Sequence, residues 1–576
     1  MTLLHDSLRR GALGILMLGA AASAWGIPAV RESFKVLQPD GTELTLRLIG
    51  DARSHIYLTE DGCPVVYDPE LGYVHASVSA DGTRIPTRLT AHDAPLRDAA
   101  ERRAARPMSA AEVTEAVADK GYGLSESTFP VTGKVRTLVI LAEFADVKFG
   151  SQLGASYKYG LYSESADPVY DYWNDLLNKS GFDGFGAQGS CRDWFLHNSA
   201  DADGNPQFEP QFDLYGPVTL PNNVAYYGRN ALSGSSVDQA AEKMIVDACR
   251  LLDDEIDYSL YDTDGDGRVD NVFVLYAGLG ENDGGGADTV WPHAWDLSYT
   301  GSSFEADGVT IDHYACSKET LYSTRMPDGI GTILHEFSHV LGLPDLYSTD
   351  YTSAYTPGKF SVLDAGPYNN NSRTPPNYSA YERWALGWMK PSVFADSGTY
   401  TLGNMADTRE VYLVPTEKET EYYLVENRQQ TGWDAYLPGH GMLIWHIDYK
   451  REVYADATVN NDPYHQHVDL IEANVRKNER YASGHPFPGE SGVRDYDFVS
   501  WSGTDCGVDF SDIAETPDGD VTVSVAVAGS GVGNIDSEAD TEAWYYDLQG
   551  RRIHTPAPGQ IVIRCTGSGT RKVTVK

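Results

Sequence analysis

Residues 331–345 decide the fold of this chain, and they read Gly331-Thr-Ile-Leu-His335-Glu336-Phe-Ser-His339-Val-Leu-Gly342-Leu-Pro-Asp345. An apolar stretch leads into two histidines four residues apart, a spacing that places both imidazoles on one face of a helix. Both can then bind one metal ion, at about 2.0–2.1 Å if that ion is zinc. Gly342 can end the helix and turn the chain back, so that Asp345 supplies an oxygen ligand. The stretch therefore predicts a three-ligand zinc site with one open position.

Glu336 follows the first histidine, where its carboxylate can act as a general base. Zinc lowers the pKa of a bound water towards ~7, so Glu336 can take a proton from that water and pass it to a leaving amine. This chemistry hydrolyses peptide bonds without a covalent intermediate. A His-Glu-x-x-His pattern alone also occurs on solvated helix faces. Here the apolar flank, the glycine and the acidic residue favour the zinc interpretation.

The complete pattern HExxHxxGxxD, from His335 to Asp345, resembles the motif of the immune inhibitor A family of secreted bacterial metallopeptidases. The resemblance extends over roughly residues 130–510. Four further stretches carry it: Leu138–Asp146, Phe212–Pro217, Val290–His293 and Pro375–Trp388. The resemblance implies an α+β zincin or metzincin-like catalytic domain. It also implies a cleft beneath an upper-rim strand that holds a peptide substrate by β-addition.

One departure concerns the turn Phe360-Ser-Val-Leu363-Asp-Ala-Gly366, which carries leucine where metzincin-like relatives place methionine beneath the metal. Leucine conserves the volume, so we expect activity to survive. The alternative is an inactive metallopeptidase fold that serves as a calcium-stiffened surface adhesin or binding protein. Tyr368, just after the turn, is a candidate donor to the oxyanion of the tetrahedral intermediate, although ordinary packing is the commoner role of a tyrosine.

A second motif predicts a structural calcium ion. Its ligands would be the side chains of Asp262, Asp264, Asp266 and Asp270 with the carbonyl of Arg268. Oxygen ligands alternate along this loop, and the glycines between them permit the sharp turn. The twelfth position is Phe273 instead of the usual bidentate glutamate, so another carboxylate would have to complete the site. A plain Asp-Gly turn is the alternative.

The pattern of strands and turns divides the chain into five parts. We expect a signal peptide over 1–24, a β-rich propeptide plus linker over 25–120, and a zinc metallopeptidase catalytic domain over 131–389. A β-sandwich over 390–528 follows, and then a linker with a small all-β C-terminal domain over 529–576. The residues Trp544–Arg552 and Arg571–Lys576 resemble C-terminal sorting domains of the type IX secretion route in Bacteroidetes. A last strand pair of the sandwich is the alternative.

Charge and targeting signals indicate an exported protein that acts on protein or peptide substrates. The chain has 83 acidic and 44 basic residues in 576, a formal net charge of −39 that disfavours nucleic acid and anionic membranes as partners. Arg9 and Arg10, an apolar run over 12–22 and the small residues 22–24 are typical of a signal peptide. No later stretch is long and apolar enough to predict a membrane span. We therefore expect secretion, or exposure on the outer membrane of a Gram-negative bacterium, with the type IX machinery as an expected partner.

The remaining metal-ligating residue types predict less. Six cysteines form no Cys-x-x-Cys pair, and the sequence does not indicate their pairing. Cys63 in the propeptide could cap the zinc as a thiolate in a zymogen, but a disulfide or free thiol explains it as easily. His465 and His467 could bind a metal, although a structural role is the commoner one.

Overall fold

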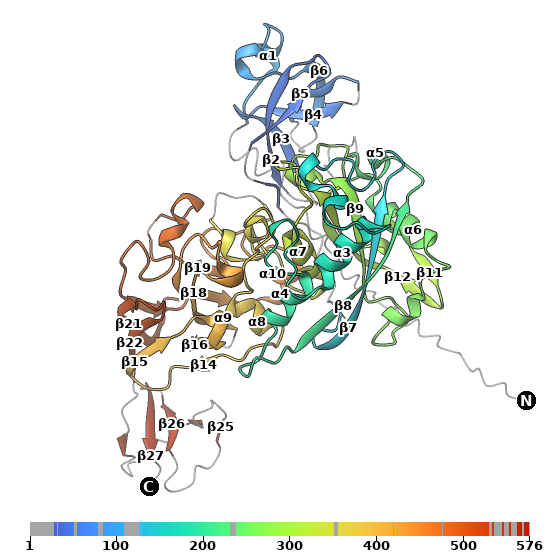
Figure 1. Ribbon diagram of the computed structural model, residues 1–576. Coiled ribbons are helices and arrows are strands. Elements are labelled where there is room, and N and C mark those ends of the chain that lie inside the picture. The colour runs from blue at the N-terminus through green and yellow to red at the C-terminus, as the bar shows by residue number, and fades with distance from the viewer. Residues whose placement is uncertain are drawn as a thin grey trace, which may run out of the picture.

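The computed structural model describes residues 28–30, 33–50, 55–68, 70–78, 84–108, 127, 129–230, 238–350, 355–418, 420–474 and 476–528, together with the strands of 533–574. The predicted signal peptide and most of the predicted linker lie outside these residues. Figure 1 shows a small blue sheet at one end, a green and yellow α/β unit, an orange to red β-rich unit, and a separate red tail.

The N-terminal unit is one antiparallel meander, in which each strand pairs with the next. Leucines at alternate positions of the second strand, Leu44, Leu46 and Leu48, point into its core, as the period of a half-buried strand requires. The elements are β1 (Phe34–Leu37), β2 (Glu43–Gly50), β3 (His55–Thr59), β4 (Pro64–Asp68), β5 (Gly72–Val78), β6 (Arg84–Thr90) and a short helix α1 (Glu101–Ala104).

The central unit is built on a five-stranded sheet in the order β10-β13-β9-β7-β8. All pairs are parallel except that between the edge strand β10 and β13, which is antiparallel. The strands are β7 (Gly133–Glu143), β8 (Phe208–Thr219), β9 (Val272–Leu279), β10 (His293–Asp296) and β13 (His313–Thr320), with a hairpin of β11 (Phe304–Ala306) and β12 (Val309–Ile311). β7 and β9 coincide with apolar, β-branched runs of the sequence at residues 135–144 and 271–276, a composition that predicts buried strands.

Helices cover both faces of this sheet, which is why β9 is buried along its whole length. Side chains of α3 (Pro168–Asn178), α4 (Cys191–Asn198) and α7 (Ile330–Val340) fill one face. α6 (Ala241–Leu251) fills the other face, with α5 (Val224–Gly228) near it. The apolar spacing of residues 237–252 predicts a helix there, but Ala240, with φ −158° and ψ 32°, lies outside the helical region, and α6 begins one residue later.

The β-rich unit contains two sheets that share one apolar core. The first, in the order β14-β16-β17-β18-β19, comprises β14 (Ser392–Val393), β16 (Tyr412–Pro415), β17 (Glu421–Arg428), β18 (Gly441–Asp448) and β19 (Val468–Ile471). The second, in the order β15-β22-β21-β20, comprises β15 (Gly398–Leu402), β20 (Tyr496–Val499), β21 (Asp505–Glu515) and β22 (Val521–Val527). Short helices α8 (Ala380–Ala385), α9 (Met405–Thr408) and α10 (Arg451–Ala455) lie in the connections.

The first of these sheets is apolar on both faces. One face packs against the second sheet, and the other contributes to the same core as helix α7. The tail forms a sheet of its own, in the order β23-β27-β26-β24-β25, so its described strands do not extend either sheet of the β-rich unit. They are β23 (Gly533–Asn534), β24 (Trp544–Tyr546), β25 (Arg552–Ile553), β26 (Ile561–Thr566) and β27 (Gly569–Thr574). The alternative of a last strand pair of the sandwich is therefore wrong.

Two further points concern membranes and thiols. In the described part of the chain, no helix is both long and apolar enough to cross a bilayer. Cys63, Cys191, Cys249, Cys316 and Cys506 are all free thiols.

Candidate metal centre

Helix α7 carries both histidines and is buried from end to end. Its start is held by Asp328, whose carboxylate accepts hydrogen bonds from Gly329 N at 2.9 Å and Thr332 Oγ1 at 2.9 Å and pairs with the buried Lys318 at 3.0 Å. Its end lies at Gly342, where φ is +91° and the chain leaves in the left-handed conformation that glycine adopts at little cost. Both ends of the helix are thus fixed, and with them the two imidazoles.

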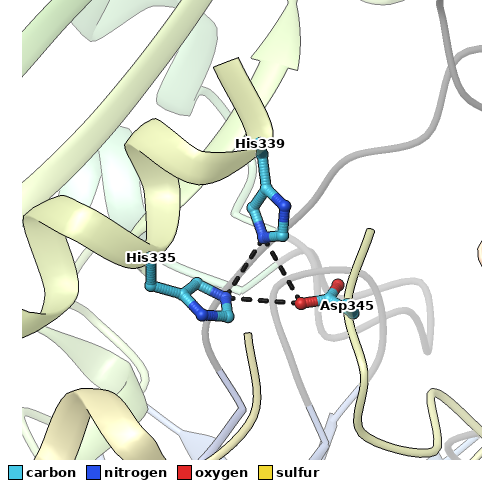
Figure 2. A group of neighbouring side chains, drawn as sticks. All are labelled: His335, His339 and Asp345. Atoms are coloured by element: carbon cyan, nitrogen blue, oxygen red, sulfur yellow. Dashed lines mark hydrogen bonds and ion pairs between the residues drawn. The ribbon is translucent and has the colours of Figure 1, made fainter. Parts of the chain in front are cut away.

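The ligand atoms of His335, His339 and Asp345 form a nearly equilateral triangle (Figure 2). The two Nε2 atoms are 3.1 Å apart, and each lies 3.3 Å from Asp345 Oδ1. Atoms bound at about 2.0–2.1 Å to one tetrahedral ion are roughly 3.3 Å apart. The separations therefore fit a zinc ion at the centre of the group.

Hydrogen bonds to the other ring nitrogens strengthen this conclusion. His335 Nδ1 donates to the carbonyl of Val362 at 2.8 Å, and His339 Nδ1 donates to the carbonyl of Leu343 at 2.9 Å. A carbonyl only accepts, so the proton of each neutral imidazole lies on Nδ1 and the lone pair on Nε2. The two Nε2 lone pairs and the carboxylate oxygen then face one another within 3.3 Å. These electron-rich atoms repel one another unless a cation lies between them.

The electrostatics of the buried group are consistent with ionised Asp345. Burial acts to raise the pKa of its carboxyl, but the two imidazoles, when protonated, outweigh this and hold the pKa well below its usual range; a bound cation takes over that role when the imidazoles are neutral. Burial acts to lower the pKa of the His335 imidazole, and the carboxylates of Asp345 and Glu336 raise it. Glu336 itself is fully buried on the same helix, within electrostatic reach of this ligand.

The turn at residues 360–366 braces the ligands through its backbone. Besides the Val362 carbonyl, the carbonyl of Leu363 accepts a hydrogen bond from Leu346 N at 2.8 Å, one residue after Asp345. The turn is itself anchored, because Ser361 Oγ donates to Glu382 of α8 at 2.6 Å. The Leu363 side chain is fully buried in the core. Leucine at this position leaves these backbone contacts in place.

Asn460, which the sequence did not single out, holds the opposite side of the ligand loop. Its Nδ2 donates to the carbonyl of Leu346 at 2.8 Å and to that of Val468 at 3.0 Å, and its Oδ1 accepts from Val468 N at 3.0 Å. The β-rich unit therefore contributes directly to the position of Asp345. No local signal could have found this residue, because its partner lies 114 positions away in the chain.

With this geometry in hand, comparison with known proteins identifies the family. Residues 128–393 match the family described as immune inhibitor A peptidase M6, catalytic domain. Residues 128–393, which we call the M6 domain, therefore resemble the catalytic domain of this family. His335, Glu336, His339 and Asp345 all lie inside the M6 domain.

Two characterised relatives are similar to part of the chain. An "Immune inhibitor A" of Bacillus thuringiensis subsp. alesti is 28% identical over 186 residues, 28% of this chain and 27% of the relative. A "Pre-pro-metalloprotease PrtV" of Vibrio cholerae serotype O1 is 26% identical over 290 residues, 45% of this chain and 30% of the relative. The matched region thus spans less than a third of the length of either relative.

Tyr368, the predicted oxyanion donor, lies at the end of a short 3-10 helix over Gly366–Tyr368 beside the M6 site. Its hydroxyl donates to the carbonyl of Pro28 at 2.6 Å and accepts from Asn282 Nδ2 at 3.1 Å. In the full-length chain, the Tyr368 hydroxyl is therefore hydrogen-bonded to the N-terminal segment. Val30 N also donates to the carbonyl of Asn282 at 2.9 Å, so residues 28–30 run alongside the M6 domain as a main-chain partner.

The structure assembles the predicted calcium loop only in part. One carboxylate oxygen each of Asp262, Asp264 and Asp270 lies within 4.8 Å of the others. The carboxylate of Asp266 is not part of this group. It accepts a hydrogen bond from Arg268 N at 2.8 Å. The guanidinium of Arg268 pairs with Asp312 at 2.6 Å.

A further group, Asp448 with His465 and His467, is better explained as a hydrogen-bond network. His465 Nε2 lies 2.7 Å from Asp448 Oδ2, and His467 Nδ1 donates to the Asp448 carbonyl at 2.5 Å. Lys450 Nζ lies 3.5 Å from the same carboxylate oxygen and supplies a positive charge there. These contacts agree with a structural role for the two histidines.

Cys63 is not part of the zinc group. Its thiol lies 3.8 Å from Arg97 Nη1 inside the N-terminal unit, and burial raises its pKa. The three metal-ligating side chains that converge at the M6 site are His335, His339 and Asp345. The suggestion that Cys63 caps the zinc is therefore wrong for this structure.

Proposed function

We propose that the chain is a secreted zinc-dependent endopeptidase. One observation carries the proposal above all others. Three ligand atoms stand 3.1–3.3 Å apart, with both Nδ1 protons directed to backbone carbonyls so that both Nε2 lone pairs face the same point. The M6 domain and the relatives named as proteases support peptide bonds as the target.

Zinc held by His335, His339 and Asp345 would lower the pKa of an attacking water and polarise the scissile carbonyl. Glu336, next to a ligand on the same buried helix, accepts the proton of that water and returns it to the leaving amine. Tyr368 donates to the oxyanion once its hydroxyl is released from Pro28. The metzincin-like character of the domain, with its single antiparallel edge strand β10, and the β-sandwich that follows belong to the same proposal.

The N-terminal unit acts in this scheme as a propeptide that keeps the enzyme latent. The support is that residues 28–30 engage Asn282 and the Tyr368 hydroxyl, the group that the mechanism requires free. A relative named as a pre-pro-metalloprotease is consistent with such a segment. Residues 1–24 would direct export, and the separate sheet of the tail supports a sorting role at the outer membrane. Loss of export on deletion of 529–576 would test the sorting role, and secretion without the tail would contradict it.

The loop around Asp262 would hold a structural calcium ion through Asp262, Asp264 and Asp270, with the Arg268 carbonyl and Asp266 as further ligands after a small rearrangement. Calcium titrated into the chelator-treated protein should raise its thermal midpoint. The double variant Asp262→Asn/Asp264→Asn should abolish that rise. A calcium response that is the same in the variant would exclude this loop.

The function is tested with two variants that separate base from ligand. Glu336→Gln should keep one zinc per chain and lose casein hydrolysis by about 10²–10⁴-fold, the usual contribution of a general base. Asp345→Asn should instead lose zinc, because a neutral amide is a weaker ligand than a carboxylate. Metal content is measured by mass spectrometry after the N-terminal unit has been cut off. Wild-type protein with full zinc and no chelator-sensitive hydrolysis would favour the adhesin alternative.

A further inference from the structure

A buried carboxylate of the M6 domain is paired with a histidine of the N-terminal unit. Glu281 follows strand β9, and its side chain is fully buried. Its Oε1 accepts hydrogen bonds from His55 Nε2 at 3.0 Å, Tyr57 OH at 2.8 Å and Asn230 Nδ2 at 2.8 Å. Two of these three donors come from β3 and would leave with the N-terminal unit.

The Trp291 ring packs against the His55 ring. The centroid of the His55 ring lies 4.5 Å from that of Trp291, with 30° between the ring planes. The His55 imidazole therefore packs at a tilt against the Trp291 ring, while its Nε2 donates to the Glu281 carboxylate. We call Glu281, Trp291 and Asn230 the Glu281 slot.

A second buried acid lies near the slot. Asp238 Oδ2 accepts a hydrogen bond from the backbone N of Trp291 at 2.9 Å. Burial, and then the charge of Glu281, raise the pKa of the Asp238 carboxyl, so the two acids are close enough to interact. A carboxylate that loses two donors in such surroundings is costly unless water or a cation replaces them.

The slot is adjacent to the residue that binds the N-terminal segment. Asn282, the residue after Glu281, accepts the main-chain hydrogen bond from Val30 and donates to Tyr368. Trp291 comes shortly before the edge strand β10, which among the described strands pairs only with β13. A substrate that replaces residues 28–30 would therefore pass the opening that His55 vacates.

We infer that the Glu281 slot is a substrate subsite for a basic side chain, with arginine preferred, and that His55 fills it in the uncleaved chain. A guanidinium is planar like imidazole, so it can stack on Trp291 while it donates to Glu281. Lysine can supply the charge but not the planar stack. This inference rests on the proposed peptidase function and adds the substrate class to it.

The experiment uses a full-length chain with a foreign protease site inserted within residues 109–126, so that the N-terminal unit can be cut off on demand. Quenched peptides that differ at one position carry arginine, lysine, norleucine or glutamate there, and the position is moved stepwise along the peptide. At one position the arginine peptide should be cleaved at least ~10-fold faster in kcat/KM than the norleucine peptide, as a buried charge-assisted pair implies.

Glu281→Gln should reduce that preference to less than about threefold, because the charged partner of the guanidinium is lost. Glu209→Gln, a half-buried carboxylate on β8 paired with Arg192 at 3.5 Å, is the matched control and should keep the full preference. Should Glu281→Gln fail to fold, Asn230→Asp carries the test, because an added negative charge should increase the preference for arginine. An unchanged preference in whichever slot variant folds, or a wild-type preference for uncharged residues at every position, would overturn the inference.

A binding measurement separates this inference from the proposed function. The Glu336→Gln chain, cut in the same way, is titrated with the fluorescent peptides and followed by anisotropy. Tighter binding of the arginine peptide than of the norleucine peptide, lost in Glu281→Gln/Glu336→Gln, supports the slot even if the wild-type chain hydrolyses nothing. Equal binding of both peptides rejects the slot even if hydrolysis is normal.

Discussion

At the scale of single residues, the metal centre depends on backbone groups more than on the identity of the side chain beneath it. His335 and the loop of Asp345 are both held by carbonyls of the turn around Leu363. The chain can therefore carry leucine where metzincin-like relatives carry methionine, since the carbonyls at 362 and 363 do not depend on that side chain. What the side chain must do is fill the core, and Leu363 is fully buried there.

This reasoning predicts that Leu363→Met is nearly silent. The two side chains have similar volumes, so the free energy of unfolding should change by less than about 1.5 kcal/mol and zinc content should stay at one per chain. Leu363→Ala, which leaves a cavity under the metal, should cost about 2–5 kcal/mol. Thermal unfolding and casein hydrolysis measure both variants. A large gain of activity in Leu363→Met would show that leucine impairs the present enzyme.

At the scale of elements, the loop between α10 and β19 supports, through Asn460, the loop that carries the candidate metal ligand Asp345. Asn460→Ala removes all three of its buried hydrogen bonds, including the one to Leu346. We expect a loss of at least ~2 kcal/mol in stability, and a loss of about 10–100-fold in zinc affinity, as for other groups that orient a ligand. Competition with a fluorescent chelator measures the affinity.

Asn427→Ala is the matched control for this prediction. Asn427 is equally buried, and its Nδ2 donates to two carbonyls, those of Leu402 at 2.8 Å and Gly519 at 2.9 Å, but both partners lie within the β-rich unit and not in the loop that carries Asp345. It should lose comparable stability and keep its zinc affinity. Equal losses of affinity in both variants would mean that the effect of Asn460 is general destabilisation and not positioning.

The elements that the sequence predicts well are those with a strong local pattern. The apolar runs that became β7 and β9, and the four-residue spacing of the histidines on α7, could be read directly because their period follows from strand and helix geometry. The convergence of Asp262, Asp264 and Asp270 was predicted in the same way, whereas the contact of Arg268 with Asp312 was not. Asn460, His55 and Glu281 escaped notice, because their partners are distant in sequence and a contact between remote segments leaves no periodic trace.

At the scale of the whole molecule, the M6 domain and the β-rich unit share a core and so depend on each other. The first sheet of the β-rich unit turns one apolar face towards α7. The side chains of this face pack in the same core as α7: Leu424, Leu443, Trp445, Ile447, Val468 and Leu470. Burial of an apolar side chain contributes about 1.5–3 kcal/mol, so the six side chains of this face account for roughly 9–18 kcal/mol. That is comparable with the entire stability of an ordinary domain.

A chain that ends at residue 389 should therefore fail to fold, although the predicted boundary of the catalytic domain lies there. It would lose those contacts and the hydrogen bond from Asn460 to the ligand loop, and it would expose the apolar side of α7 and its neighbours. The matched control ends at residue 528 and keeps both sheets, because the described strands of the tail pair only with one another. We expect the shorter chain to aggregate without a cooperative thermal transition and the longer one to unfold at the temperature of the full chain. A soluble 1–389 chain that binds zinc and unfolds cooperatively would show that the shared core is dispensable, and that the M6 domain is an independent unit to which the β-rich unit is merely attached.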